Sequence, residues 1–389
     1  MNSFSVISSP EEFLKLKSQW NELLCGSSGD SIFLTWEWIY SWWESYKAGK
    51  NLWIVICQNE TELIGIFPLY RKQTKRVRII SYKELFLLGD GSGDSDYLDF
   101  IIKEGVEGQV IPAFVNFLLE NKKHWDIFNF NEVPQDSLCK KIFQEEVSKK
   151  KMKWWEKEVP CIYVELPDIW EEYLSELKPR MRTKIRSLPA RLLKQHSFEI
   201  SCCNKNDNFS ILLESLFDLH GRRWSENGEA GVFHSPEKMN FYYKITEKFL
   251  FQSWLRFYSL SVDGQYIAHQ FCFKYRNNLY LLQEGFAPDF ISWGIGNILR
   301  AHVFKDCIES KISQYDFLSG MSDHKLSWGG KVKISSRVVL GWSSVKNLLV
   351  FEFPRMMEWA KKKVKPWVPK AILDSKRKWN SARKININI

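Results

Sequence analysis

Two glycines at the start of a predicted helix are the residues of this chain best suited to chemistry. An apolar strand is predicted to end at Glu284. A helix then opens at a turn formed by Gly294, Ile295, Gly296 and Asn297. Glycines let backbone N–H groups approach an anion, and the helix dipole favours negative charge at a helix N-terminus. We therefore expect this turn to bind a phosphate-bearing ligand. A purely structural tight turn is the alternative.

The elements around the turn would position it between two strands. The strand that ends at Glu284, a helix over 297–308 and a strand over 315–318 form a βαβ unit. A dinucleotide-binding Gly-x-Gly-x-x-Gly motif is excluded, because Leu299 stands where the third glycine is required. A P-loop is excluded as well, because no Gly-Lys-Ser/Thr follows. The turn is therefore neither of these two nucleotide-binding motifs.

A basic segment upstream is a second candidate for phosphate contact. Seven basic residues without an acid are Lys178, Arg180, Arg182, Lys184, Arg186, Arg191 and Lys194. Arg182 and Arg186 share one helical face at a spacing of four residues, and guanidinium groups suit phosphate recognition. We expect these two arginines to contact the phosphate-bearing ligand. A solvated helical face is the alternative.

Three further segments have the order and spacing of known motifs. They are a basic helix from Leu177 to Leu193, the run Leu219-His220-Gly221-Arg222-Arg223-Trp224 with Gly231-Val232-Phe233, and Asp316–Gly320 with Lys325 and Trp328. Together with the glycine turn they resemble the GNAT acyltransferase superfamily. The nearest branch is that of FemAB-like proteins and the acetyltransferases of cellulose and exopolysaccharide biosynthesis. Ile291 departs from the usual pyrophosphate loop, which has Gln or Arg there, and this leaves the acyl carrier open.

The resemblance implies a fold and a set of site residues. The fold is α/β, with two tandem GNAT-like halves and a basic helical C-terminal extension. Glu284 would accept the proton of the acceptor amine, and Asp316 and Lys325 would join it in catalysis. Lys325 would stabilise an oxyanion or a donor phosphate. A solvated Glu284 at a strand end is the alternative.

The resemblance also supplies candidates for substrate binding. They are His220, Arg223, Trp224, His269 and Trp328. His269 lies in the middle of a mostly apolar strand, so a hydrogen-bonded core histidine is the alternative there. The turn over 294–297, with Arg182 and Arg186, would bind the donor. No metal is expected, because no His or Cys spacing suggests zinc.

The function implied by the resemblance is acyl transfer from acyl-CoA to an amine. The acceptor would be an amino sugar or another precursor of a cell-surface polysaccharide, attacked without a covalent enzyme intermediate. One alternative is FemAB-like aminoacyl transfer from charged tRNA, although the near-neutral body of the chain argues against nucleic acid. Another is a non-catalytic GNAT-like scaffold in polysaccharide assembly.

The predicted organisation has three parts, residues 1–165, 166–342 and 343–389. The hairpins predicted over 53–68 and 257–270 are similar, which indicates that two related halves form the body. The loop over 89–96 superficially resembles a calcium loop, but it lacks the glycine at the sixth position and the closing glutamate. A surface loop is expected there instead.

Charge and cysteine usage bear on location. The net charge of the 389-residue chain is +9, and the segment from Arg355 to Ile389 accounts for all of it. Tryptophans and other apolar residues alternate with this charge, which suits an anionic membrane surface, although a helix packed on the second half is the alternative. The eight cysteines show no C-x-x-C, and no secretory signal or membrane-spanning run is evident. We expect a cytoplasmic protein, with peripheral attachment to the inner face of the membrane as a further expectation.

Overall fold

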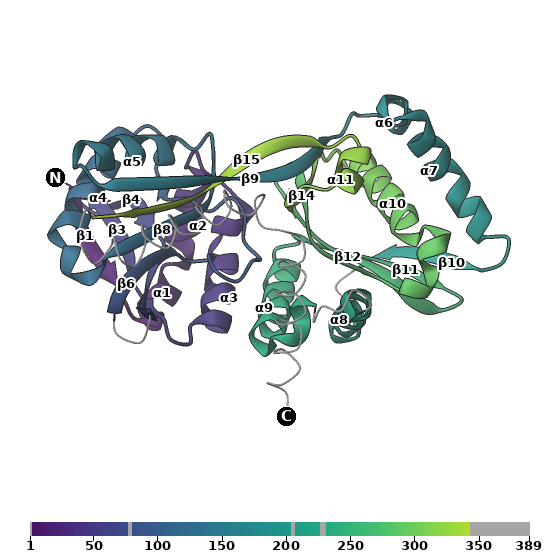
Figure 1. Cartoon of the computed structure of the whole chain (residues 1–389), viewed down its shortest axis with the longest axis horizontal. Helices are drawn as coiled ribbons and strands as arrows, with labels where there is room; N and C mark the ends of the chain where they lie inside the picture. The colour runs from purple at the N-terminus through teal and green to yellow at the C-terminus, as the bar shows by residue number, and fades with distance from the viewer. Residues whose placement is uncertain (1, 77–79, 204–206, 226–230, 343–389) are drawn as a thin grey trace, which may run out of the picture.

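The protein consists of two halves that lie side by side and are joined by two long strands (Figure 1). The computed structural model describes residues 2–76, 80–203, 207–225 and 231–342. The predicted basic tail, residues 343–389, lies outside the described residues. The predicted α/β class with two halves is confirmed. None of the described helices is both long enough and apolar enough to cross a bilayer.

The second half carries the glycine turn. Its elements in chain order are β10 (Phe198–Cys202), α8 (Phe209–Ser225), α9 (Pro236–Phe251), β11 (Leu255–Val262), β12 (Gln265–Tyr275), β13 (Asn278–Phe286), α10 (Ile295–Glu309) and β14 (Gln314–Ser319). The predicted bounds of α10 and β14 and the predicted end of β13 agree with the structure to within two residues. Ser235 explains the sharp start of α9, because its side chain accepts a hydrogen bond from Lys238 N and Pro236 follows it. Helices α7 (Pro179–Leu192) and α10 lie on one side of the sheet, and α8 and α9 lie on the other (Figure 1).

The first half repeats the same order of elements. They are β1 (Asn2–Ile7), α1 (Pro10–Lys15), α2 (Lys17–Cys25), α3 (Trp36–Tyr46), β3 (Ile54–Asn59), β4 (Glu62–Phe67), β7 (Ile101–Ile102), α4 (Glu107–Glu120) and β8 (Ile127–Pro134). The hairpins β3–β4 and β11–β12 both contain a register shift, which supports the predicted repeat. One helix was expected over 10–24, but the structure has two, α1 and α2, with Leu16 between them.

A further hairpin of the first half lies beside its strand β8. It consists of β5 (Leu69–Arg76) and β6 (Ile80–Leu87), with the short strand β2 (Asn51–Leu52) beside β5. Strand β6 pairs with β8 in parallel over three residue pairs. The hairpin therefore lies against β8, on the side opposite to the one that faces the second half.

The halves exchange their last strands. These are β9 (Lys153–Glu165) and β15 (Lys331–Gly341), which pair with each other in antiparallel orientation along their length. Strand β9 also pairs with β14 of the second half, and β15 pairs with β8 of the first. The central strand order β14-β9-β15-β8 makes one continuous sheet across both halves (Figure 1). Neither strand was predicted from the sequence.

The loop over 89–96 holds the halves together rather than lying on the surface. Asp94 is buried and forms an ion pair of 2.5 Å with Lys238 of α9, while Ser95 accepts a hydrogen bond from Trp38 Nε1 of α3. The expectation of a surface loop is therefore wrong. Polar residues could be buried here because each finds a partner in the opposing helices.

The remaining elements are short or lie at the periphery. They are η1 (Ile32–Leu34), η2 (Lys122–His124), α5 (Leu138–Lys149), α6 (Trp170–Glu176), α7 (Pro179–Leu192), η3 (Val232–His234), η4 (Pro288–Trp293) and α11 (Asp323–Ser327). The basic helix expected over 177–193 is α7. Its buried residues, Met181, Ile185, Leu188 and Leu192, pack against the second half.

Candidate active site

Strands β13 and β14 separate beside the glycine turn and leave a pocket between them. They pair in parallel only over Asn278–Tyr280 and Gln314–Asp316. Beyond this point a pocket of about 400 Å³ opens, lined by Leu281 of β13, Phe317 of β14 and the first turn of α10. We call it the splay pocket. It puts an opening in the sheet next to a helix N-terminus.

The two glycines of the turn have different reasons to be glycine. Gly294 has a left-handed φ of +70°, and a Cβ there would lie 2.8 Å from Leu188 Cδ1, so the backbone itself requires glycine. Gly296 has neither constraint, because its Cβ would meet only the ring of Phe286, at 3.9 Å. Gly296 lines the splay pocket, where a side chain would take up space.

The start of α10 is open to an anion. Gly294 is the N-cap residue, so no side chain caps the helix, and the first turn has no acidic residue. The first N–H groups of a helix have no partner within it. Asn297 also lines the pocket, and its buried Oδ1 has no hydrogen-bond partner among the described residues.

A charged cluster surrounds this helix start. Arg300 of α10 is almost fully buried and donates a hydrogen bond from Nη2 to Glu284 Oε2, while Arg223 Nη1 lies 3.9 Å from Glu284 Oε1. Burial acts most strongly and lowers the pKa of Arg300, but the Glu284 carboxylate, together with Tyr315 and Cys272, raises that pKa overall. Lys325 donates from Nζ to the carbonyls of Phe317 and Ser319, and burial lowers its pKa. Three basic side chains thus surround one carboxylate.

His324 completes the cluster as a neutral side chain. Burial, followed by the charge of Arg300, lowers the pKa of His324 to about 4. Its ring nitrogens lie 3.2 and 3.3 Å from Arg300 Nη1. At neutral pH an uncharged imidazole can accept a proton or a hydrogen bond beside Glu284. Because His324 is neutral, the pocket carries the charge of one carboxylate and three basic side chains, which is an excess of positive charge.

The structure brings many of the predicted site residues together. Those that line the splay pocket are Glu284, Gly294, Ile295, Gly296, Asn297, Lys325 and Arg223. Asp316 does not join them. Its buried carboxylate lies on the opposite face of β14, where it accepts a hydrogen bond from Tyr97 and pairs with Lys333 at 2.8 Å. A role for Asp316 as a free base has no support in this geometry.

Two other candidates lie behind the pocket wall. His269 is fully buried and bonds to Ser259 and Ser215, which agrees with the alternative of a core histidine. Trp328 is also fully buried. The guanidinium of Arg300 lies 5.8 Å from the centre of its ring, so Trp328 packs against that arginine. Neither side chain lines the pocket.

His220 and Trp224 lie on the same predicted motif. His220 is buried near Arg223, and burial, followed by the Arg223 charge, lowers its pKa to about 4. Trp224 lies in α8, but its side chain is outside the described part of the chain. The contribution of both to substrate binding stays a prediction.

The two flanks of α7 differ in what they contact. Arg182 donates to the carbonyl of Ser175, and Arg186 pairs with Glu171 at 2.6 Å, so both predicted phosphate ligands are engaged by α6 and its C-terminal end. On the other flank Arg191 donates to the carbonyl of Ser292 and stacks over Trp293. Lys184 lies close enough to His324 to help lower its pKa. The flank with Lys184 and Arg191 therefore lies on the side of the splay pocket, although neither side chain lines it.

Sequence reasoning missed two residues of the cluster, Arg300 and His324. Arg300 interrupts the apolar run of a predicted helix, between Leu299 and Ala301. A charged residue in such a run is a signal for a buried ion pair, because it would be costly without a partner. His324 precedes the predicted Lys325 in the chain, but nothing in the sequence placed it next to Glu284.

The corresponding region of the first half is closed. Helix α4 follows β7 as α10 follows β13, but Glu107 in its first turn is buried and accepts hydrogen bonds from Gly105 N and Ser28 Oγ. A carboxylate of the chain itself thus occupies the helix start that α10 leaves open. An anion site of this kind is therefore built in the second half.

Comparisons with known proteins agree with this placement. Residues 179–326 match the family model of the acetyltransferase (GNAT) domain. The structure of FemX is similar to this chain with a TM-score of 0.59 and 11% identity, covering 86% of this chain and 96% of that one. A conserved protein of unknown function from Bacteroides thetaiotaomicron has a TM-score of 0.53 at 12% identity, covering 88% and 100%. No curated protein sequence matched.

A third similar structure extends the same fold. It is the C-terminal domain of a protein described as a lysylphosphatidylglycerol synthetase from Agrobacterium fabrum, with a TM-score of 0.50 and 10% identity, covering 88% and 96%. At such identities the likeness shows the fold. Residues 179–326 of the second half therefore match a GNAT acetyltransferase domain, and the fold of the chain is similar to that of FemX, which agrees with the predicted resemblance.

Proposed function

We propose that the protein is an N-acyltransferase that takes an acyl group from acyl-CoA and transfers it to an amine. The observation that carries the proposal is the uncapped start of α10 in a positively charged pocket, where β13 and β14 separate. The N–H groups of that turn would bind the pyrophosphate. The opening between the strands would hold the thioester. Arg223, Arg300 and Lys325 suit the negative charge of the donor.

The proposed reaction is a direct attack. The amine nitrogen forms a bond to the thioester carbonyl carbon, the carbon–sulfur bond breaks, and the proton released by the amine ends on the CoA thiol. Glu284 is the group proposed to accept that proton first, since it is the carboxylate that lines the splay pocket. Lys325 lies beside Phe317 and would stabilise the oxyanion. His324 is a second base within the same cluster.

A matched pair of glycines tests the donor site. Gly296 and Gly108 are each the second residue of their helix, α10 and α4, and neither meets a close neighbour at its Cβ. In Gly296→Val the side chain would displace the pyrophosphate, so acetyl-CoA affinity should fall by more than about tenfold, or about 1.4 kcal/mol. Gly108→Val should bind as the wild type does. Calorimetry with acetyl-CoA measures both, and equal affinity in folded Gly296→Val would remove the turn from the site.

One observation favours a second function, aminoacyl transfer from charged tRNA. Arg180, Lys184, Arg191 and Lys194 fall on one flank of the basic helix at helical spacing, with Arg191 at the edge of the splay pocket. A row of basic residues that leads away from a pocket suits a longer polyanion. Titration with charged tRNA in place of acetyl-CoA distinguishes the two donors. Binding of neither would favour the non-catalytic scaffold.

A further inference from the structure

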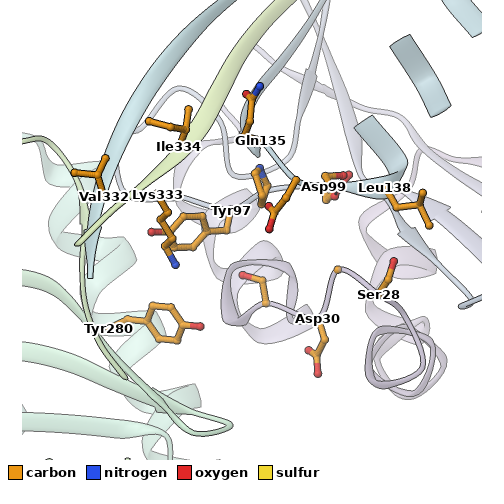
Figure 2. A pocket seen from close by; sticks show the side chains of 15 residues that line it. Ser28, Asp30, Tyr97, Asp99, Gln135, Leu138, Tyr280, Val332, Lys333 and Ile334 are labelled. Carbon is orange, nitrogen blue, oxygen red and sulfur yellow. Dashed lines mark hydrogen bonds between the residues drawn. The ribbon is translucent and has the colours of Figure 1, made fainter. Parts of the chain in front are cut away.

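A second pocket lies between the two halves. Its volume is about 650 Å³, the larger of the two described so far. The first half supplies the loop over 28–31, Tyr97, Asp99 and residues 134–138, and the second half supplies Tyr280 of β13. The exchanged strand β15 closes the pocket with residues 332–334 (Figure 2). We call it the interhalf pocket. It exists because the halves are held together by their exchanged strands.

The interhalf pocket lies on the other face of the sheet from the splay pocket. Tyr280 lines the interhalf pocket, and its neighbour Leu281 lines the splay pocket. Likewise the Asp316 side chain contacts Tyr97 and Lys333, whereas Phe317 lines the splay pocket. Consecutive side chains of a strand point to opposite faces. The two pockets therefore meet the sheet from opposite sides, where β13 and β14 begin to separate.

The register of the strands places the two pockets at the same level. Ser319 of β14 pairs with Cys161 of β9, and Cys161 pairs with Lys333 of β15. Lys333 thus lies two strands from the end of β14, or about 10 Å at the usual strand spacing. A ligand between Lys333 and Tyr280 would lie opposite the separated ends of β13 and β14.

The charges around the interhalf pocket are mostly negative. Asp30, Asp99 and Asp136 line it, against a single amine, that of Lys333. Lys333 is already engaged, because its Nζ lies 2.8 Å from the Asp316 carboxylate and 4.1 Å from the centre of the Tyr97 ring. Asp30 is offset by Arg276, which does not line the pocket.

Asp99 and Asp136 have no ion-pair partner among the described residues. Asp99 is nearly fully buried and accepts hydrogen bonds only from Ser137 Oγ and its own neighbour Phe100 N. The charge of Lys140 has only a small effect on the pKa of Asp99, and the Nζ of Lys140 is itself paired with Glu156. Burial raises the pKa of Asp99 to about 7, and a cation in the pocket would favour its charged form.

We propose that the interhalf pocket holds an ammonium group of the acceptor, so that the acceptor carries at least two amines. Carboxylates together with Tyr280 on the wall suit such a cation, since aromatic faces attract ammonium groups. One amine stays in the pocket as a cation. The other, unprotonated, points toward the opening between β13 and β14 and attacks the thioester. The proposal rests on the proposed acyl transfer and narrows its substrate to a diamine or a doubly aminated sugar.

The proposal is tested with three compounds of one chain length. They are cadaverine, with two amines, pentylamine, with one, and aminopentanoate, with a carboxylate at the far end. Calorimetry with the full-length protein, with and without saturating CoA, should show cadaverine bound at least about tenfold more tightly than aminopentanoate. Asp136→Asn and Asp99→Asn should each weaken cadaverine about fivefold. The matched control is Asp168→Asn. Asp168 is an exposed aspartate just before α6 that pairs with Lys311, and its substitution should leave cadaverine affinity unchanged.

The outcomes separate this proposal from the donor site. Equal affinity for aminopentanoate and cadaverine, wild-type affinity in both pocket variants, or no cadaverine binding at all would each overturn it. Because Asp136 is exposed, Asp136→Asn carries the test if Asp99→Asn fails to fold. Failure of acetyl-CoA to bind the wild type would instead overturn the proposed function. Cadaverine titration without CoA would still report on the interhalf pocket in that case.

Discussion

Glu284 has two tasks at the scale of the single residue, since it is the proposed base and also the partner of buried Arg300. In Glu284→Gln, turnover should fall by roughly 10²–10⁴-fold if the carboxylate takes the proton. The free energy of unfolding should also fall, by about 3–5 kcal/mol, because Arg300 loses its counter-charge. Steady-state kinetics and chemical unfolding measure the two effects separately.

An exposed ion pair provides the control for this substitution. Glu171 pairs with Arg186 at the surface, so Glu171→Gln should cost at most about 1 kcal/mol and leave turnover unchanged. Wild-type turnover in a folded Glu284→Gln would remove Glu284 from the chemistry. His324 would then be the next group to test.

Asp96 connects the two halves and should make stability depend on pH. Its buried carboxyl accepts a hydrogen bond from Ser319 N of β14, and burial raises its pKa from 3.8 to about 7. The stabilising protonated form is fully present below pH 4 and is lost as the pH rises through about 7. Asp96→Asn stays neutral throughout, so its stability relative to the wild type should increase between pH 4 and 8 by at least about 1.4 kcal/mol.

Urea unfolding at both pH values measures this difference. The comparison is between the two proteins at each pH, so that other titrating groups contribute equally to both. A difference between wild type and Asp96→Asn that is the same at pH 4 and pH 8 would mean that folding does not raise the pKa of Asp96.

The two flanks of α7 give a prediction at the scale of the element. Lys184 and Arg191 lie on the side of the splay pocket, whereas Arg182 and Arg186 contact α6 and its C-terminal end. The double substitution Lys184→Gln with Arg191→Gln should lower the affinity for acetyl-CoA by up to about tenfold, and this loss of affinity should shrink at high salt. The pair Arg182→Gln and Arg186→Gln removes the same charge from the other flank. It should leave donor affinity unchanged, and a larger loss in this pair would restore the original prediction for these arginines.

Most single elements could be predicted from the sequence, but the exchanged strands could not. Helix α9 has Ser235, Pro236 and regular apolar spacing, all of which are local signals. Strand β9 crosses between the halves, so its middle, Glu156–Glu158, is largely exposed and lacks the alternation of a half-buried strand. Its partners β14 and β15 lie more than a hundred residues away in the chain. Pairing over such distances leaves no local pattern.

The candidate site was predictable to the extent that its residues follow one another. Gly294 to Asn297, Glu284 and Lys325 belong to a single βαβ unit, so their proximity follows from its connectivity. Successive side chains of β14 point to opposite faces of the sheet, and the sequence alone does not show which face Asp316 occupies. The interhalf pocket is built from five separate stretches of the chain, and only the folded structure brings them together.

At the scale of the whole molecule, the exchanged strands should make the two halves unfold together. Leu340 of β15 is fully buried in the core of the first half, so Leu340→Ala should cost about 2–5 kcal/mol. Because β15 also pairs with β9, amides of the second half should lose the same protection from hydrogen exchange. Loss of protection confined to the first half would show that the halves are independent.

The basic tail gives the last prediction. Residues 343–389 lie outside the described structure, and the prediction rests on their sequence alone. The full-length chain should sediment with vesicles rich in anionic lipid, and raising the salt towards about 0.5 M should release it. A chain that ends at Glu352 should stay in the supernatant and still bind acetyl-CoA. Equal sedimentation of both chains would contradict a membrane role for the tail.

The exchange of β9 and β15 has a consequence for any attempt to divide this protein. A fragment that ends after β9 would carry a long strand whose two partners are missing, and its β8 would have lost β15. The complementary fragment would expose the edge of β14. Unpaired edges of this length favour aggregation. Each fragment should therefore be insoluble alone. Both should be soluble when they are made in one cell, because each supplies the strands that pair with the open edges of the other.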